Sequence, residues 1–99
     1  MLVAQGWSVL DRNWRGGGGE LDRVVLRGGE LRFVEVKLRA EDDALADDAV
    51  PAHKRTRLRG AARAWLEAHG EHAAAASAFM VVWVDAAGQA RLLDDAFDG

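Results

Sequence analysis

Two strand-like segments separated by a pair of glycines constrain the fold of this chain more than any other feature. Residues 20–27 and 30–37 are rich in Val, Leu and Phe, and Gly28 and Gly29 lie between them. Type I′ turns need positive φ at both central positions, so a Gly-Gly pair between two such segments is a strong signal for a hairpin. The sequence therefore predicts an antiparallel β-hairpin.

The hairpin also determines which side chains lie opposite each other. A two-residue turn at the glycines places Asp22 opposite Glu35. The same register places Glu20 opposite Lys37. Side chains alternate between the two faces of a strand, so these four groups share one face. Directly opposite positions have Cβ atoms roughly 5 Å apart, so two like-charged carboxylates would be held together.

The pattern admits three ways to compensate the repulsion between Asp22 and Glu35. A divalent cation can lie between the carboxylates, since Mg²⁺ takes one or two protein carboxylates and keeps several waters. The amine of Lys37, two residues from Glu35 on the same face, can balance one charge. Alternatively, one acid can stay protonated with a raised pKa.

A metal ion beside an amine is suited to phosphodiester hydrolysis. The metal would polarise a phosphoryl oxygen and hold a water, and Lys37 would orient that water or stabilise the growing negative charge. The backbone carbonyl of Val36 is a third predicted metal ligand, and Glu20 would tune or join the site. The competing interpretation is a solvated strand end, in which Glu20 pairs with Lys37 and Asp22 stays in water.

The rest of the chain predicts an α/β domain with a mixed sheet. Leu58, Ala62, Trp65 and Leu66 recur at helical spacing, and a strand, a helix and a further strand in succession favour a parallel crossover. The expected elements are strands at 7–14, 79–84 and 91–93, and a helix from Pro51 to His69. The length of 99 residues predicts a single domain over residues 1–99.

Composition excludes several classes of protein. The chain has no cysteine, which excludes disulfide frameworks and thiolate metal sites. Its apolar stretches are too short to span a membrane as a helix, and its start lacks the pattern of a signal peptide. We therefore expect a cytoplasmic protein with no membrane association. The net charge of −3 gives no global attraction to nucleic acid but allows a local basic face.

Such a basic face is predicted on the helix. Arginine and lysine provide most of the affinity for a phosphate backbone, so these residues are candidates for nucleic-acid binding. The candidates are Lys54, Arg55, Arg59 and Arg63, together with Arg15 beside the glycine run. The alternative is a solvated helix face. The run at residues 16–19 is not a P-loop, because no Gly-Lys-Ser/Thr follows it.

Several motifs of the chain resemble those of the YraN family of bacterial proteins. They are Gly19-Glu20-Leu21-Asp22, Phe33-Val34-Glu35-Val36-Lys37, the segment AVPAHKRTRLRGAA at 49–62, FMVVWVD at 79–85 and Asp94-Asp95-Ala96-Phe97. That family looks like Holliday-junction resolvases of the restriction-endonuclease-like, PD-(D/E)XK fold. The resemblance implies an α-β-β-β-α-β core with a mixed central sheet. It also implies metal and catalytic positions at Asp22, Glu35 and Lys37, with Glu20 beside them.

The chain departs from the family pattern at three points. Family members usually begin with a further helix carrying a Gly-Glu pair, and we expect this chain to be N-terminally short and to lack it. Leu38 follows Lys37 where the family usually has threonine. Acidic residues crowd the loop at 41–48, which is expected near the substrate and would repel phosphate.

The leading hypothesis from the sequence is an endonuclease that uses Mg²⁺ or Mn²⁺ to cut DNA, branched or junction DNA included. Two alternatives stay open. One is a nucleic-acid-binding module of the same fold that does not cut. The other is a protein-interaction module that uses this fold to contact a partner or to form a homodimer.

Overall fold

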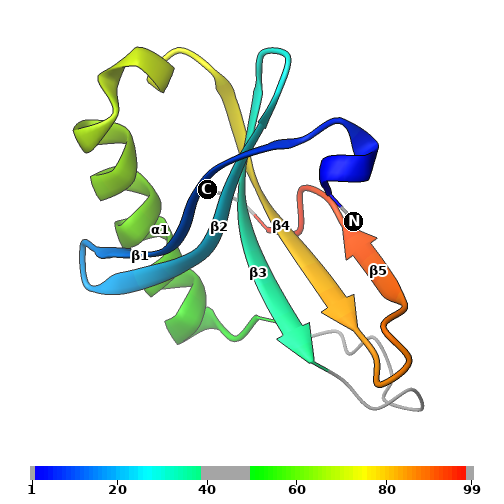
Figure 1. The fold of residues 1–99 in the computed structure, drawn as a ribbon. Helices are drawn as coiled ribbons and strands as arrows, with labels where there is room; N and C mark the ends of the chain where they lie inside the picture. The colour runs from blue at the N-terminus through cyan, green and yellow to red at the C-terminus, as the bar shows by residue number, and fades with distance from the viewer. Residues whose placement is uncertain (1, 39–49, 98–99) are drawn as a thin grey trace.

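The protein is a mixed β-sheet with a helix packed on one face, as seen in a computed structural model that describes residues 2–38 and 50–97 (Figure 1). The strands are β1 (Ser8–Gly16), β2 (Gly19–Arg27), β3 (Glu30–Leu38), β4 (Ala76–Val84) and β5 (Ala90–Leu93). They lie side by side in this order, and β3 and β4 are parallel while the other neighbours are antiparallel.

Helix α1 (Ala52–Ala68) lies between β3 and β4 in the chain, and short 3₁₀ turns η1 (Val3–Gln5) and η2 (Gly70–His72) complete the described elements. The predicted fold class, α/β with a mixed sheet, is confirmed; the finer restriction-endonuclease-like arrangement stays a prediction. The acidic loop predicted at 41–48 lies outside the described residues. Within the described residues, no helix has the length and apolar character needed to cross a membrane.

The hairpin predicted from the Gly-Gly pair is present, and its ladder keeps the predicted register as far as it extends. The ladder ends before the predicted pairs Asp22–Glu35 and Glu20–Lys37, which are therefore not formed as paired ladder positions. Arg27 lies opposite Glu30, and Val24 lies opposite Phe33. Of the two glycines in this turn, only Gly28 has a positive φ, of 60°. This corrects the type I′ expectation, because a positive φ at the first central position alone is typical of a type II′ turn. Both primed turns match the twist of antiparallel strands, so the register is the same.

The predicted boundaries shift where strand pairing or capping decides them. β4 begins at Ala76 instead of Phe79, because its first residue pairs with Glu30 in the parallel ladder. Pro51 keeps an extended backbone with ψ of 158° and precedes the first helical residue, so α1 begins one residue after it. Proline suits this position because its missing amide costs the helix no hydrogen bond.

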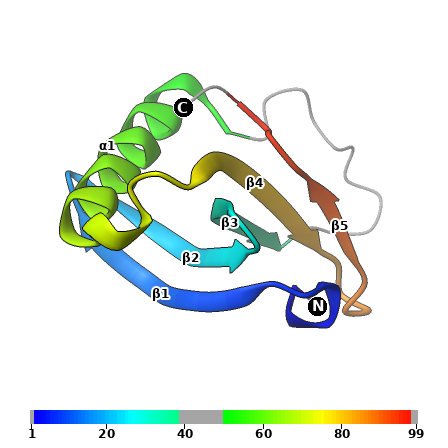
Figure 2. The ribbon, with the colours of Figure 1, turned by 90° about the horizontal axis from the view of Figure 1, so that it is seen from above.

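Two hydrophobic layers hold the sheet, with α1 and η1 on opposite sides of it (Figure 2). On the helix side, Trp65 and Phe33 are buried, with their ring centroids 6.0 Å apart in an edge-to-face contact. The opposite layer is smaller and packs Trp7 and Leu2 against the outward side chains of the central strands. The helix side is therefore the larger core. The charged residues at the start of β2 and near the end of β3 lie on the same side of the sheet.

The predicted glycine turn at 16–19 is tight and packs directly on α1. Gly17 and Gly18 have φ of 59° and 85°, as a two-residue type I′ turn requires. A Cβ atom at Gly17 would overlap the backbone carbonyl of Gly60 in α1, and one at Gly19 would overlap that of Arg57. The tip of the β1–β2 hairpin thus meets the helix through main-chain atoms, which brings the start of β2 beside the first turns of α1.

Candidate active site

An open cleft of about 560 Å³ lies between the β1–β2 hairpin, β3 and the first turns of α1. Its lining residues are Arg15, Gly18, Gly19, Glu20, Asp22, Glu35, His53, Lys54, Arg57 and Leu58. Three predicted acidic site residues and two predicted basic ones therefore meet in one place. Lys37 is half-buried on β3 but is not among the residues that line this cleft.

Asp22 lies where β2 separates from β3. The ladder between these strands ends at the pair formed by Arg23 and Val34. The amide of Val36 then donates to Asp22 Oδ2 at 2.8 Å. This carboxylate accepts the hydrogen bond that a backbone carbonyl of β2 would accept if the ladder continued. The N–H and C=O of one strand residue point to the same edge, so we expect the Val36 carbonyl to face β2 as well.

Glu35 is a buried carboxylate whose charge is only partly compensated. The pKa of Glu35 is raised above its ordinary value, first by burial and then by the adjacent Asp22 carboxyl, while Lys54 opposes the shift. Lys54 Nζ lies 3.0 Å from Glu35 Oε2, which makes an ion pair. This one partly exposed lysine balances the buried charge of Glu35 only in part, because the pKa of Glu35 stays raised.

Glu20 pairs across the β1–β2 hairpin. Arg15 Nε donates to Glu20 Oε1 at 2.8 Å, and the two side chains are 83% and 38% exposed. The solvated interpretation had Glu20 pairing with Lys37, and this contact gives it a different partner. Exposed ion pairs contribute at most about 1 kcal/mol, so both groups can exchange this contact for another charged partner at low cost.

The basic residues of α1 divide between two flanks of the helix. Lys54 and Arg57, three residues apart, line the cleft with His53. Arg55 Nε donates to the carbonyl of Val50 at 2.6 Å on another side of the helix. The structure therefore does not gather all the predicted basic residues of α1 into one patch.

The second flank faces the C-terminal segment. The guanidinium carbons of Arg55 and Arg59 lie 5.7 and 5.9 Å from the ring centroid of Phe97. Arg63 is exposed and borders a separate groove beside Phe33 and Phe79. Sequence reasoning missed Arg57 and His53 as cleft residues, although the i, i+3 spacing of Arg57 from Lys54 was an available signal.

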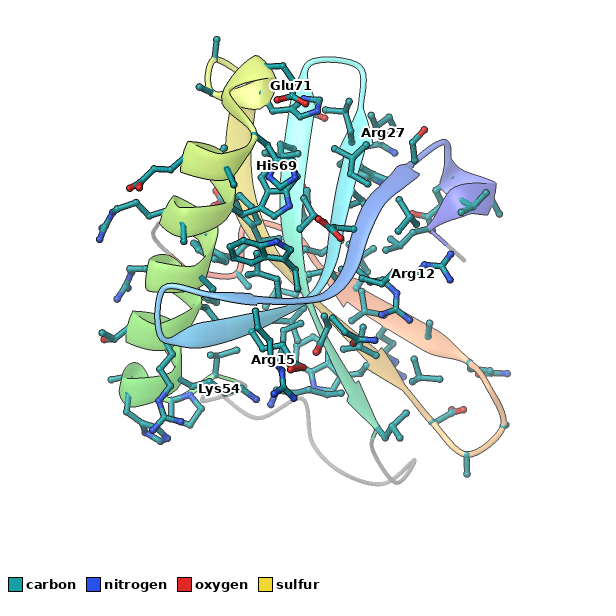
Figure 3. The ribbon with its side chains drawn as sticks, turned by 60° about the vertical axis from the view of Figure 1, so that its left-hand side comes forward. Arg12, Arg15, Arg27, Lys54, His69 and Glu71 are labelled. Atoms are coloured by element: carbon teal, nitrogen blue, oxygen red, sulfur yellow. The ribbon has the colours of Figure 1, made fainter. Side chains whose placement is uncertain are left out.

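Figure 3 labels side chains near both ends of α1. Arg15 from β1 and Lys54 from the start of the helix both lie toward the lower end of the view. His69 and Glu71 lie at the opposite end of the helix, and Arg27 lies near the tip of the β2–β3 hairpin. The cleft is therefore confined to the N-terminal end of α1.

The model of Uncharacterised protein family UPF0102 matches residues 1–87 of this chain, which is most of its length. The chain belongs to the UPF0102 family. It is 42% identical over 98 residues to a UPF0102 protein of Methylorubrum extorquens (strain PA1), covering 99% of this chain and 76% of that relative.

Other relatives bear the same family description. The chain is 46% identical over 105 residues to UPF0102 protein gll3754 of Gloeobacter violaceus, covering 99% of this chain and 83% of the relative. It is 52% identical over 65 residues to a UPF0102 protein of Solibacter usitatus, covering 63% of this chain and 49% of the relative. The YraN-type resemblance is thus confirmed at the level of the family, while the relation to restriction endonucleases stays a prediction.

The donor set of this UPF0102 cleft fits a hard divalent cation better than a structural metal. Within residues 2–38 and 50–97, no three His, Cys, Asp or Glu side chains come together as a metal-binding group. Structural zinc sites need about four protein ligands, which this cleft does not offer among its described residues. Mg²⁺ needs only one or two carboxylates with water, and the pair of Glu35 and Asp22 in this cleft fits that requirement.

Proposed function

We propose that this UPF0102 protein is a metal-dependent endonuclease that hydrolyses phosphodiester bonds in DNA. The observation that supports it most is the pair formed by Asp22 and Glu35 inside a cleft rimmed by cationic side chains. Holding two carboxylates together, one of them buried, disfavours the charged form of Glu35. Perturbed carboxylates in a cleft are typical of functional sites, where a ligand supplies the missing compensation.

Asp22, Glu35 and the Val36 carbonyl are the groups that would hold Mg²⁺ or Mn²⁺. When bound, the metal would supply Lewis-acid polarisation of a phosphoryl oxygen and lower the pKa of a bound water. The Val36 amide fixes the Asp22 carboxylate in place through a 2.8 Å hydrogen bond, so this ligand is already oriented. Burial keeps bulk water away from Glu35, which is 8% exposed.

Lys37 and Glu20 are the remaining catalytic groups of the proposal. Lys37 comes two residues after Glu35 on the same strand, where we propose that its amine orients the attacking water or stabilises negative charge on the phosphate. Glu20 lies in the cleft with Asp22 and would tune the site or coordinate through water. Its exposed partner Arg15 would be available to a DNA phosphate.

DNA would be held by phosphate contacts from two sides of the cleft. Arg15 comes from the hairpin, and Lys54 and Arg57 come from the helix. Arg55, Arg59 and Arg63 would extend the contact along the other flank of α1. Because the net charge of the chain is −3, binding would depend on this local arrangement and fall steeply as salt rises. Branched DNA is the substrate class that the family resemblance favours.

The test is cleavage of duplex, flap and four-way DNA with Mg²⁺ or Mn²⁺. We expect Asp22→Asn and Lys37→Ala each to lower the cleavage rate at least about 100-fold, because each removes a group from the site of charge development. Glu71→Gln, at the far end of the helix, is the matched control and should keep wild-type activity.

Three results would contradict the proposal. Cleavage that survives both changes would come from a contaminant. Binding of DNA that depends on salt, with no metal-dependent cleavage on any of the three substrates, would favour the non-cutting nucleic-acid-binding module. An absence of salt-dependent DNA binding would favour the protein-interaction module.

A further inference from the structure

Lys54 occupies a place in the cleft that phosphate binding alone does not explain. Its ammonium lies 3.0 Å from Glu35 Oε2, the same carboxylate that is proposed as a metal ligand. The lysine side chain is 41% exposed, whereas that of Glu35 is 9% exposed. A partly solvated amine is thus paired with a buried acid.

An ammonium and a divalent cation cannot both lie against one buried carboxylate at little cost. Two positive charges a few ångströms apart repel each other by several kcal/mol at an effective dielectric constant of about 20. The ammonium carries a single charge and its side chain is 41% exposed, so it can leave Glu35 for solvent when a doubly charged cation binds. The flexible four-carbon stem of lysine allows the amine to move without moving α1.

We propose that Lys54 is a built-in counter-ion of Glu35 that a divalent cation displaces, and that the released amine then contacts a DNA phosphate. This inference rests on the proposed function, because it assumes that Glu35 holds metal. Lys54 neutralises the acid pair in the metal-free protein. It leaves when the metal arrives.

The surroundings of Lys54 direct the released amine toward an anion. Among the described residues that line the cleft, Arg15, His53 and Arg57 provide no carboxylate for it, and Asp22 is a proposed metal ligand. Glu20, the third described acid of the cleft, already accepts a hydrogen bond from Arg15. A phosphate entering the cleft is therefore the favoured new partner, which couples metal binding to DNA binding in a reciprocal way.

The test is Mn²⁺ binding measured by isothermal titration calorimetry, in the absence of DNA, at about pH 8, where free carboxylates are ionised. We expect Lys54→Gln to bind Mn²⁺ about fivefold to tenfold more tightly than wild type, because a competing cation is gone. Lys54→Arg keeps the charge and should bind within about twofold of wild type. Arg12→Gln removes one exposed charge of β1 outside the cleft and should leave the affinity unchanged within about twofold.

Wild-type protein provides a second measurement that needs no folded Lys54 variant. Acylation of Lys54 by an amine-reactive reagent, read by mass spectrometry, should become several-fold faster when Mn²⁺ is added. The same addition should change nothing in Asp22→Asn, which lacks a proposed ligand.

The outcomes separate this inference from the function on which it rests. Equal or weaker Mn²⁺ binding by folded Lys54→Gln, or unchanged acylation of Lys54 in wild type, would overturn the counter-ion role while leaving the metal site standing. Equal Mn²⁺ binding by wild type and Asp22→Asn would remove the metal site, and with it both proposals.

Discussion

Strand β3 buries two charged side chains to the same extent, and the two are compensated very differently. Arg32 and Glu35 are each 8% exposed. Arg32 Nε donates to Asp94 Oδ1 at 2.6 Å, and Glu30 Oε2 lies 3.4 Å from its Nη2. Its guanidinium also lies 5.6 Å from the ring centroid of Trp7. Glu35, three residues along the same strand, has one lysine and a second acid.

The pKa shifts show what the difference means. The pKa of Arg32 is raised, first by its hydrogen bond to Asp94, so the folded state favours the charged guanidinium. The pKa of Glu35 is also raised, first by burial, so the folded state disfavours the charged carboxylate. A raised pKa favours the protonated form, which is charged for arginine and neutral for glutamate. The same direction of shift therefore stabilises the charge of Arg32 and destabilises that of Glu35. A buried charge that is compensated by opposite charges and hydrogen bonds stabilises the fold, whereas one that is compensated only in part is a place where a ligand can bind.

The largest difference should appear in catalysis. We expect Glu35→Gln to lower metal-dependent DNA cleavage at least about 100-fold, because the neutral amide is a poor ligand for a hard cation. Arg32→Ala should keep the cleavage rate per folded molecule within a few-fold of wild type. Rates normalised to the folded fraction, measured by circular dichroism, would decide this. Equal losses in the two variants would mean that the two clusters do not differ in role.

The loss of stability should follow the reverse order, with the larger loss in the Arg32 variant and none in the Glu35 variant. Arg32→Ala should lower the free energy of unfolding by about 2 kcal/mol, because it removes charged hydrogen bonds that are worth about 1.5–3 kcal/mol. Urea denaturation measures this value directly. Arg91→Ala, an exposed arginine on β5, is the control and should change stability by less than about 0.5 kcal/mol. A similar loss in both variants would contradict the structural role of Arg32.

Glu35→Gln should raise stability at neutral pH by about 0.5–1 kcal/mol, as substitutions at strained functional positions commonly do. The charged form is disfavoured in the folded state, so the wild type loses stability as pH rises from the unfolded pKa through the folded pKa. The advantage of the glutamine variant should therefore disappear below about pH 4, where the unfolded glutamate is protonated too. Thermal unfolding across this pH range tests it, and a variant less stable than wild type at neutral pH would contradict it.

The smallest effect should come from Asp94. Its pKa is lowered, first by the hydrogen bond from Arg32, so it contributes stability above the unfolded pKa. This contribution should be lost as pH falls from about 4 through the lower folded pKa. The side chain is 42% exposed, so solvent screening keeps the effect small. Wild type and Asp94→Asn should converge in stability at low pH, and a difference that grows there would contradict the assignment.

The sequence predicted the acid pair because its position depends on local chemistry. A Gly-Gly turn and alternating side chains determine the β2–β3 register, which brings Asp22 and Glu35 to one place without knowledge of the rest of the fold. The ends of the strands were less predictable. Ala76 joins β4 only because β3 lies beside it.

The cationic side of the cleft was only partly predictable. Lys54 was expected to bind phosphate, but its pairing with Glu35 depends on how the helix is rotated on the sheet. Arg57 and His53 line the cleft for the same reason. Helical spacing groups residues into flanks, yet it does not tell which flank meets a cleft. The contact between the glycine turn and the backbone of Gly60 sets that rotation. It joins residues far apart in the sequence, so the local pattern of the helix does not reveal it.

That docking has a consequence for how the cleft can vary. The gap between the acids of β2 and the cations of α1 is held by peptide groups touching at Gly17 and Gly60, with no side chain between them. Gly19 meets the backbone of Arg57 in the same way. Substitutions on the rim outside these three glycines can alter charge or shape without widening the gap. A larger side chain at any of the three would push the hairpin and the helix apart, so the site tolerates new chemistry far more readily than a new width.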